Sequence, residues 1–307
     1  MRRLIEEFPA SERRICGLMK IPRTTFRYQS RRDDSELRER LLALAREKPR
    51  YGYRRLHVLL RRNPKQEGER INHKRLWRVY RELGLSVRRT RRKRLQRMLR
   101  PRPILTAANQ EWAIDFASDV AASGRRLRIF SVVDSYTREC LALEVDTSMP
   151  SRRVTRVLAR IVEQRGTPMA IRSDNGPELS SRHFLAWCIE RKVDAIHIQP
   201  GKPTQNAHVE SFHGRLRDEC LNVSWFWNLW DARHKIAAWR IEYNCERPHS
   251  ALGYRTPIEF ASKAASLSLG SNTTRPDQPQ GNPSGSAVAA TPASALIPIR
   301  PCEGGLR

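Results

Sequence analysis

The sequence has little acidic charge, and it lacks long apolar runs. Its 307 residues carry 58 Lys and Arg against 32 Asp and Glu, a formal net charge of +26. The apolar runs are far shorter than the ~18–20 residues that span a bilayer. Residues 1–20 carry charges every few positions and lack the apolar stretch of a secretion signal. The sequence therefore argues against a membrane protein and predicts a cytoplasmic one.

The sequence also lacks closely spaced cysteines. Its six cysteines lie far apart along the chain, and none of them forms a Cys-x-x-Cys pair. No cysteine and histidine residues are grouped at the spacing of a zinc site. A structural zinc ion is therefore not expected, and the length allows about two domains with their own hydrophobic cores.

The excess positive charge is concentrated in the first third of the chain. Residues 1–105 hold 33 Lys and Arg and 11 Asp and Glu, a net +22, while residues 106–307 hold 25 and 21, a net +4. Basic surfaces bind polyanions because each neutralised phosphate releases condensed counterions. The charge therefore predicts nucleic acid as the partner of residues 1–105. A merely solvated basic face and an acidic membrane surface are the alternatives.

Short amphipathic helices are predicted within this basic region. Residues 11–28 hold a helix, a turn and a second helix start, which is helix-turn-helix spacing. Further helices are expected over residues 35–47 and 51–60. Another helix is expected between a cap at Asn72 and a stop at Gly84, with an apolar stripe opposite a basic face. That basic face predicts DNA contacts at Lys74, Arg75, Arg78 and Arg81.

A run of positively charged residues follows these helices and predicts a linker that lies along the phosphates of DNA. Its DNA-contacting members are Arg88, Arg89, Arg91, Arg92, Lys93 and Arg94. The composition changes after Pro103, which predicts a domain boundary between residues 105 and 106. Residues 264–307 contain 6 Pro, 5 Gly, 6 Ser and no aromatic residue. Such a composition cannot bury a core and predicts a disordered tail.

Residues 106–263 alternate between strand and helix patterns. The patterns predict a three-stranded meander, then helix, strand, helix and strand, and two final helices. This order predicts an α/β fold, in which a mixed sheet is flanked by helices. The strands are expected over residues 112–116, 127–134, 139–145, 170–174 and 195–198, and the helices over residues 151–165, 181–192, 206–221 and 229–245.

Three acidic residues occupy positions that suggest metal chemistry. Asp115 interrupts an apolar strand, Asp174 ends a strand, and Glu210 lies in the first turns of a helix. Taken singly, Asp174 is also a residue that favours a turn. Glu210 also interacts favourably with the positive end of the helix dipole. Three oxygen ligands on separate elements are what Mg²⁺ or Mn²⁺ prefers. Two such ions can drive an in-line phosphodiester displacement.

Arg217 follows Glu210 by seven residues, or about two helical turns. Both side chains can therefore face the same bound phosphate. Glu210 and His213 also match the Glu-x-x-His pattern of di-iron bundles, but the second copy that such a site requires is missing.

Five stretches of the sequence carry a resemblance to a known family: residues 112–116, 133–139, 173–178, 201–214 and 243–254. Thirty-five residues separate Asp174 from Glu210. With these features the chain resembles the second-frame catalytic subunit of bacterial insertion-sequence transposases of the D,D-35-E type, which are similar in their core to retroviral integrases. The resemblance covers about residues 30–261.

The resemblance implies a ribonuclease-H-like core preceded by a helical region of helix-turn-helix type. It implies that Asp115, Asp174 and Glu210 hold two Mg²⁺ or Mn²⁺ ions and that Arg217 is the basic residue following the glutamate. Lys202, in the loop before Glu210, is expected to contact DNA. The implied activity is cleavage at the ends of an insertion sequence and transfer of a 3′-hydroxyl strand into target DNA.

The implied partners are double-stranded DNA, further copies of the chain in a multimer, and an upstream helix-turn-helix subunit joined by frameshifting. The implied location is the bacterial nucleoid. Gln205 departs from the Asp that is most frequent in the family's loop, a change that concerns substrate positioning. Two other functions stay open: a DNA-binding regulator whose catalytic core does not assemble, and a simple ribonuclease H.

Overall fold

The computed structural model describes residues 11–27, 33–64, 69–87, 104–198 and 206–270, and side chains up to residue 266. The chain divides into two compact units, residues 1–87 and 88–307. The predicted boundary after residue 105 therefore falls inside the second unit. The predicted DNA contacts at residues 88–94 and at Lys202 lie outside the described residues, as does the chain from residue 271 onward.

The described part of the first unit is helical, as the sequence predicts. A buried apolar cluster joins three of its helices, in which Leu41, Leu56 and Leu76 are 0% exposed. The Asn72 side chain caps the last helix by accepting a hydrogen bond from the Lys74 backbone amide at 2.9 Å. The helices are α2 (Glu12–Leu18), α3 (Arg23–Arg27), α4 (Ser35–Glu47), α5 (Tyr53–Arg62) and α6 (His73–Glu82).

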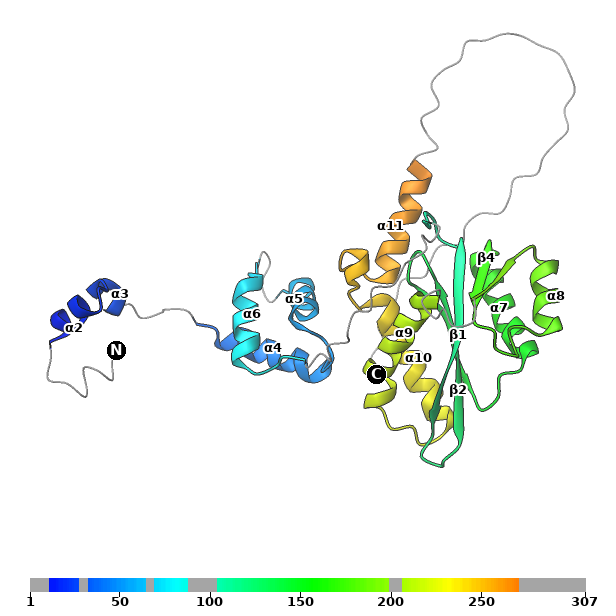
Figure 1. The fold of residues 1–307 in the computed structure, drawn as a ribbon, viewed down its shortest axis with the longest axis horizontal. Coiled ribbons are helices and arrows are strands. Elements are labelled where there is room, and N and C mark those ends of the chain that lie inside the picture. Colours follow the sequence, from blue (N-terminus) through cyan, green and yellow to red (C-terminus); the bar gives the residue numbers. More distant parts are fainter. Residues whose placement is uncertain (1–10, 28–32, 65–68, 88–103, 199–205, 271–307) are drawn as a thin grey trace, which may run out of the picture. The chain divides into compact units, whose positions relative to one another are not determined.

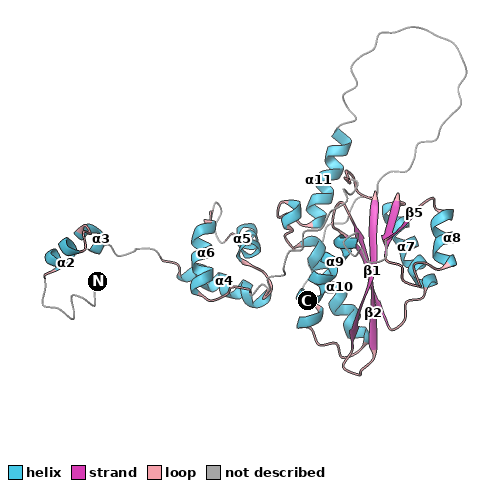
Figure 2. Cartoon of the chain, in the orientation of Figure 1, coloured by secondary structure: helices cyan, strands magenta, loops and turns pink. Residues whose placement is uncertain are grey.

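The second unit contains a mixed sheet, which confirms the predicted α/β class. In the described residues the sheet has five strands in the order β3-β2-β1-β4-β5. The first three strands pair antiparallel, whereas β4 pairs parallel with both β1 and β5 (Figure 2). The strands are β1 (Glu111–Val120), β2 (Arg126–Asp134), β3 (Cys140–Asp146), β4 (Ala170–Ser173) and β5 (Asp194–His197).

Helices cover both faces of this sheet (Figure 1). Because side chains alternate along a strand, Trp112 and Ile114 pack with α7 (Ser151–Arg165) and α8 (Arg182–Glu190). Ala113 and Ala117, on the opposite face of β1, pack with α9 (Ala207–Glu219) and α10 (Leu229–Cys245). The alternation therefore decides which side chains of β1 point toward α9.

The start of the predicted disordered tail is wrong. Helix α11 (Pro257–Gly270) continues past residue 264 and follows the short helices η2 (Leu221–Val223) and η3 (Ser250–Leu252). Its start is a capping box: the Thr256 amide donates to Glu259 Oε2 at 2.8 Å, and the Glu259 amide donates to Thr256 Oγ1 at 3.2 Å. Among the described residues, no helix is long and apolar enough to cross a membrane.

Candidate catalytic site

Asp115 lies on the face of β1 that is covered by α9, between Ala113 and Ala117. Its side chain is 20% exposed, and its Oδ2 atom lies 3.4 Å from Nδ1 of His213, a buried residue of α9. The other ring nitrogen of His213, Nε2, lies 2.7 Å from the Ser131 hydroxyl oxygen on β2. The carboxylate of Asp115 is thus held by a contact that joins the sheet to α9.

The contacts run from a serine through a histidine to an aspartate, as in the catalytic triad of a hydrolase. The serine, Ser131, is however not positioned to attack a substrate. Ser131 is 0% exposed. Its hydroxyl also donates to the Asp115 backbone carbonyl oxygen at 3.1 Å. A nucleophile has to be accessible to its substrate, so this arrangement contacts the Asp115 carboxylate without forming a nucleophilic site.

Asp174 directly follows β4, the strand that pairs parallel with β1. The parallel ladder between these strands ends with the pair of Ala113 and Arg172. Asp115 and Asp174 each lie two residues beyond this pair along the chain. Both acidic residues therefore follow the same end of the β1–β4 ladder.

The turn after β4 fixes the Asp174 side chain. The Gly176 amide donates a hydrogen bond to Asp174 Oδ1 at 3.2 Å. A Cβ atom at position 176 would lie 3.2 Å from that oxygen, which is closer than most real contacts. Asn175 anchors the turn to the sheet through its Nδ2 atom, which donates to the Ile198 carbonyl oxygen at 3.1 Å. Glycine at position 176 therefore leaves room for the carboxylate.

A clamp from β2 holds the far end of the same turn. Arg128 forms an ion pair with Glu178 at 2.8 Å. Its guanidinium carbon also lies 4.4 Å from the ring centroid of Phe116, the neighbour of Asp115 in β1. The loop that carries Asp174 is thus tied to β2 by an ion pair whose arginine also contacts β1, the strand that carries Asp115.

Glu210 and Arg217 lie on the exposed side of α9. Glu210 is three residues before His213, and residues at this spacing are neighbours on a helix surface. Its carboxylate therefore lies one turn from the imidazole that contacts Asp115. Within the described part of the chain, neither Glu210 nor Arg217 makes a hydrogen bond or ion pair.

The three predicted carboxylates come from neighbouring elements, but they are not gathered at ligand distances. The described residues contain no group of three or more His, Cys, Asp or Glu side chains that could hold a metal ion. Asp115 and Asp174 both lie just beyond the end of the β1–β4 ladder, and Glu210 lies one helical turn before His213, the residue that contacts Asp115. Carboxylate oxygens are the donors that Mg²⁺ and Mn²⁺ prefer, so the chemistry of this set fits such ions.

A buried ion pair lies on the same face of the sheet, where β1 and β4 begin to pair. Glu111 Oε2 accepts hydrogen bonds from Arg172 Nε at 3.0 Å and Nη2 at 2.6 Å. Glu111 also accepts one from the Ser135 hydroxyl at 2.9 Å. Burial raises the pKa of Glu111, but the bonds and charge of Arg172 outweigh it and hold that pKa below its usual value. Glu111 and Arg172 are 61 residues apart in the sequence, so no local pattern indicates this pair.

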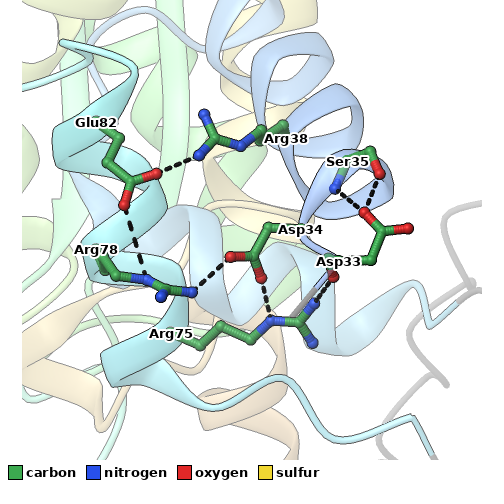
Figure 3. Close-up of polar contacts among 7 residues, drawn as sticks. All are labelled: Asp33, Asp34, Ser35, Arg38, Arg75, Arg78 and Glu82. Carbon is green, nitrogen blue, oxygen red and sulfur yellow. Dashed lines mark hydrogen bonds and ion pairs between the residues drawn. The ribbon is translucent and has the colours of Figure 1, made fainter. Parts of the chain in front are cut away.

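The basic face of α6 is partly used within its own unit (Figure 3). Arg75 Nε donates to Asp34 Oδ1 at 2.6 Å and its Nη2 donates to the Asp33 carbonyl oxygen at 2.7 Å. Arg78 binds the other oxygen of Asp34 and also pairs with Glu82. The hydrogen bond from Arg75 holds the pKa of Asp34 below its usual value. These contacts tie α6 to the start of α4.

The other two predicted DNA contacts of α6, Lys74 and Arg81, do not pair with acidic residues of the described part of the chain. Lys74 is exposed, and its side chain makes no hydrogen bond or ion pair with any described residue. The guanidinium carbon of Arg81 lies 5.0 Å from the ring centroid of Trp77, which is 43% exposed. Lys74, Trp77 and Arg81 follow each other at helical spacing and form one exposed stripe.

Domain-family models match both units of the chain. Integrase core domain models match residues 106–203 and 191–257, and an HTH-like domain model matches residues 31–94. The HTH-like match covers α4, α5 and α6. The helix-turn-helix spacing of residues 11–28 lies outside it.

Relatives of the chain come from bacterial insertion elements. A 31.7 kDa protein of insertion element IS407 from Burkholderia multivorans is 46% identical over 261 residues, which cover 84% of this chain and 93% of that protein. The transposase InsD of insertion element IS2A/D/F/H/I/K from Escherichia coli is 30% identical over 249 residues, covering 78% and 83%.

Among solved structures, the chain is similar in fold to a chain of the simian T-cell lymphotropic virus intasome in complex with PP2A regulatory subunit B56 gamma. The TM-score is 0.47 at 15% identity, and the match covers 80% of each chain.

The mixed sheet and the integrase core define a class of protein, the polynucleotidyl transferases of the DDE type. The relatives narrow the class, and the chain belongs to the family of insertion-element transposases. It is thus an enzyme of DNA transposition, with an HTH-like domain and a catalytic core that both imply DNA binding.

Proposed function

We propose that Asp115, Asp174 and Glu210 hold two Mg²⁺ or Mn²⁺ ions for cleavage at insertion-sequence ends and for strand transfer into target DNA. The observation that supports the proposal is the contact of Asp115 with His213 of α9, because the same helix carries Glu210 and Asp174 follows the strand that pairs with β1. When bound, a metal pair activates the attacking hydroxyl and stabilises the leaving oxygen in an in-line displacement.

The residues around the carboxylates have separate tasks in this proposal. His213, supported by Ser131, orients the Asp115 carboxylate. Arg217 lies two turns beyond Glu210 on the exposed side of α9, where its guanidinium can bind a DNA phosphate. Gly176 leaves space for the Asp174 carboxylate. Positioning of this kind supplies a large share of catalysis in phosphoryl transfer.

For the first unit we propose that Lys74 and Arg81 contact DNA phosphates, with Trp77 beside them. Arg75 and Arg78 also face this surface, although both already bind Asp34. The arginines and lysine at positions 88–94 and Lys202 complete the proposed DNA contacts. The net charge of +22 over residues 1–105 supports the contacts in that region, whereas the family resemblance supports Lys202.

The proposal extends to the partners of the enzyme. Two element ends have to be joined to one target, so we propose a multimer of this chain. An upstream helix-turn-helix subunit, fused by frameshifting, is proposed to help find the element ends. Because its DNA substrate is bacterial, we propose that the enzyme works at the nucleoid in the cytoplasm.

Strand joining tests the proposed site. The assay uses a labelled duplex with the element's own ends, a plasmid target, and either Mg²⁺ or EDTA. We expect the Asp115→Asn, Asp174→Asn and Glu210→Gln variants to lose metal-dependent joining and to keep DNA affinity. Glu190→Gln is the control, because this side chain is 71% exposed and belongs to α8, which packs on the face of the sheet opposite to α9. A carboxylate variant that joins as well as the wild-type protein would contradict the assignment.

The same proteins test the two other functions. Cleavage of an RNA–DNA hybrid that exceeds joining of DNA would favour a ribonuclease H. DNA binding by the wild-type chain without any joining, even with the upstream subunit added, would favour a regulator.

A further inference from the structure

Three tryptophans are exposed close together between α9 and α10. Trp225, Trp227 and Trp230 are 66%, 69% and 67% exposed, and they lie within six residues of one another. We call residues 225–230 the tryptophan turn. Exposed tryptophan costs free energy because its large apolar surface stays in water. A grouping of this kind marks a surface that another molecule covers.

The tryptophan turn is held in place by buried and hydrogen-bonded neighbours. Phe226 is 3% exposed, and its carbonyl oxygen accepts from the Ala122 amide at 2.7 Å. The Trp227 amide donates to Asp231 Oδ2 at 3.0 Å, and Lys235 Nζ donates to the Trp225 carbonyl oxygen at 2.8 Å. The tryptophans are therefore presented by an anchored segment, which lowers the entropy cost of binding.

The apolar surface continues along the outer side of α10. Ala237, Ala238 and Ile241 are exposed there, and Ile241 is 55% exposed. These residues follow Trp230 by seven, eight and eleven positions, so they lie on the same side of the helix. The opposite side of α10 packs into the core through Ile236 and Trp239. Helix α10 thus has apolar residues on both its covered and its outer side.

The charges of this segment favour a protein partner over DNA. Arg233 pairs with Asp146 at 2.7 Å, and Lys235 pairs with Asp231 at 2.8 Å. The ring of His234 lies 3.8 Å from that of Trp230. The cations beside the tryptophan turn are therefore already engaged with carboxylates, whereas DNA binding relies on cations that can neutralise phosphates.

We propose that the tryptophan turn and the outer side of α10 form the surface where a second copy of this chain docks. Three tryptophans at this exposure offer on the order of 400 Å², about half of one partner's share of a standard interface. Val223 and Ile241, which are 52% and 55% exposed, extend the patch. A two-fold contact uses the same patch twice, so one surface serves both copies. The inference rests on the multimer in the proposed function.

Sedimentation velocity on the full chain tests this surface. The protein is measured without DNA and at high salt, over a wide range of concentrations. The variant carries Trp227→Ser and Trp230→Ser, which remove two exposed rings from the patch. The control is Trp77→Ser, since Trp77 is also exposed but belongs to the first unit. Tryptophans are frequent hot spots of interfaces, so we expect the dissociation constant of the double variant to rise at least a hundredfold and that of the control to stay within threefold.

Tryptophan fluorescence supplies a second measurement. In the wild-type protein the emission is expected to shift to shorter wavelengths as the copies associate, and the double variant is expected to lose this shift. A wild-type chain that stays monomeric, or a double variant that associates as tightly as wild type, would overturn the proposal. Quenching by duplex DNA that disappears only in the double variant would also overturn it and identify DNA as the occupant.

The test of the docking surface does not depend on the proposed metal site. Glu210→Gln is expected to associate like the wild-type protein, because Glu210 lies outside the patch. Unchanged joining by Glu210→Gln would refute the metal site alone, whereas unchanged association of the tryptophan variant would refute the docking surface alone.

Discussion

At the scale of single residues, the direction of the Asp115 carboxylate depends on side chains from two other elements. His213 comes from α9 and Ser131 from β2, and together they form a chain of contacts of 3.4 and 2.7 Å. Residues that orient a ligand typically change metal affinity by about 10–100-fold when they are removed. His213 therefore acts through Asp115 in the proposed mechanism.

We predict that His213→Ala raises the Mn²⁺ concentration for half-saturation at least tenfold, because Asp115 loses its orienting contact. His213→Asn keeps a polar group at this position and is expected to recover part of the affinity. Mn²⁺ binding, measured by electron paramagnetic resonance without DNA, and joining as a function of Mg²⁺ concentration provide the two readouts. Ser211→Ala, a change at an exposed neighbour in α9, is the control. Equal Mn²⁺ affinity in wild type and His213→Ala would refute this role.

At the scale of elements, the site depends on how β1 and β4 are aligned. The Glu111–Arg172 ion pair links the two strands four residues before Asp115 and two residues before Asp174. Arg172 holds the pKa of Glu111 below its usual value despite burial. A carboxylate with a depressed pKa stabilises the fold above its unfolded pKa of about 4.3. This stability is lost as the pH falls through the lower folded pKa.

We therefore predict that the free energy of unfolding decreases more steeply below about pH 4 in the wild-type protein than in Glu111→Gln. Urea unfolding at a series of pH values measures the difference between the two slopes. At neutral pH the variant is expected to be less stable, because Arg172 loses its buried partner. Parallel pH profiles for the two proteins would show that Glu111 does not contribute in this way. Glu163→Gln, a change at an exposed residue of α7, controls for the loss of one negative charge.

Elements with a strong hydrophobic period were predictable from the sequence. The bounds of α4 and α7 agree with the predicted ranges because their apolar stripes run from end to end. The bounds of α10 agree as well, although its apolar residues lie on both of its sides. Strand β1 is longer than predicted, since its pairing with β2 extends through the polar residues Ser118 and Asp119. The composition of residues 264–307 does not indicate the end of α11, a helix that begins at the capping box of Thr256.

The candidate site likewise contains residues that a local sequence pattern indicates and contacts that only the fold shows. Asp115, Asp174 and Glu210 could be found because each stands in a recognisable local pattern, and their metal role stays a prediction. The contact between Ser131 and His213 joins residues 82 positions apart, so no local pattern reports it. The Glu-x-x-His spacing did single out His213, but only the fold shows that its ring contacts Asp115.

At the scale of the whole molecule, charge separates the two functions of the chain. Residues 1–105 carry a net +22, while the remaining residues carry a net +4. A catalytic core with nearly balanced charge binds DNA weakly by itself, because counterion release scales with the number of neutralised phosphates. The basic region can thus supply affinity, and the carboxylates of the core can supply chemistry.

A charge variant of the full chain tests this division. We predict that replacing Arg88, Arg89, Arg91 and Arg92 by Ala lowers the log–log salt slope of DNA affinity by about 3 to 4, since each lost phosphate contact contributes about 0.9. The slope is obtained from fluorescence anisotropy between low and moderate salt. The control removes the same charge from four exposed arginines of α7 and α8, namely Arg152, Arg156, Arg160 and Arg182. If the control lowers the slope as much as the first variant does, net charge governs affinity and the basic region has no special role. A fall confined to the first variant would instead locate the phosphate contacts in that region.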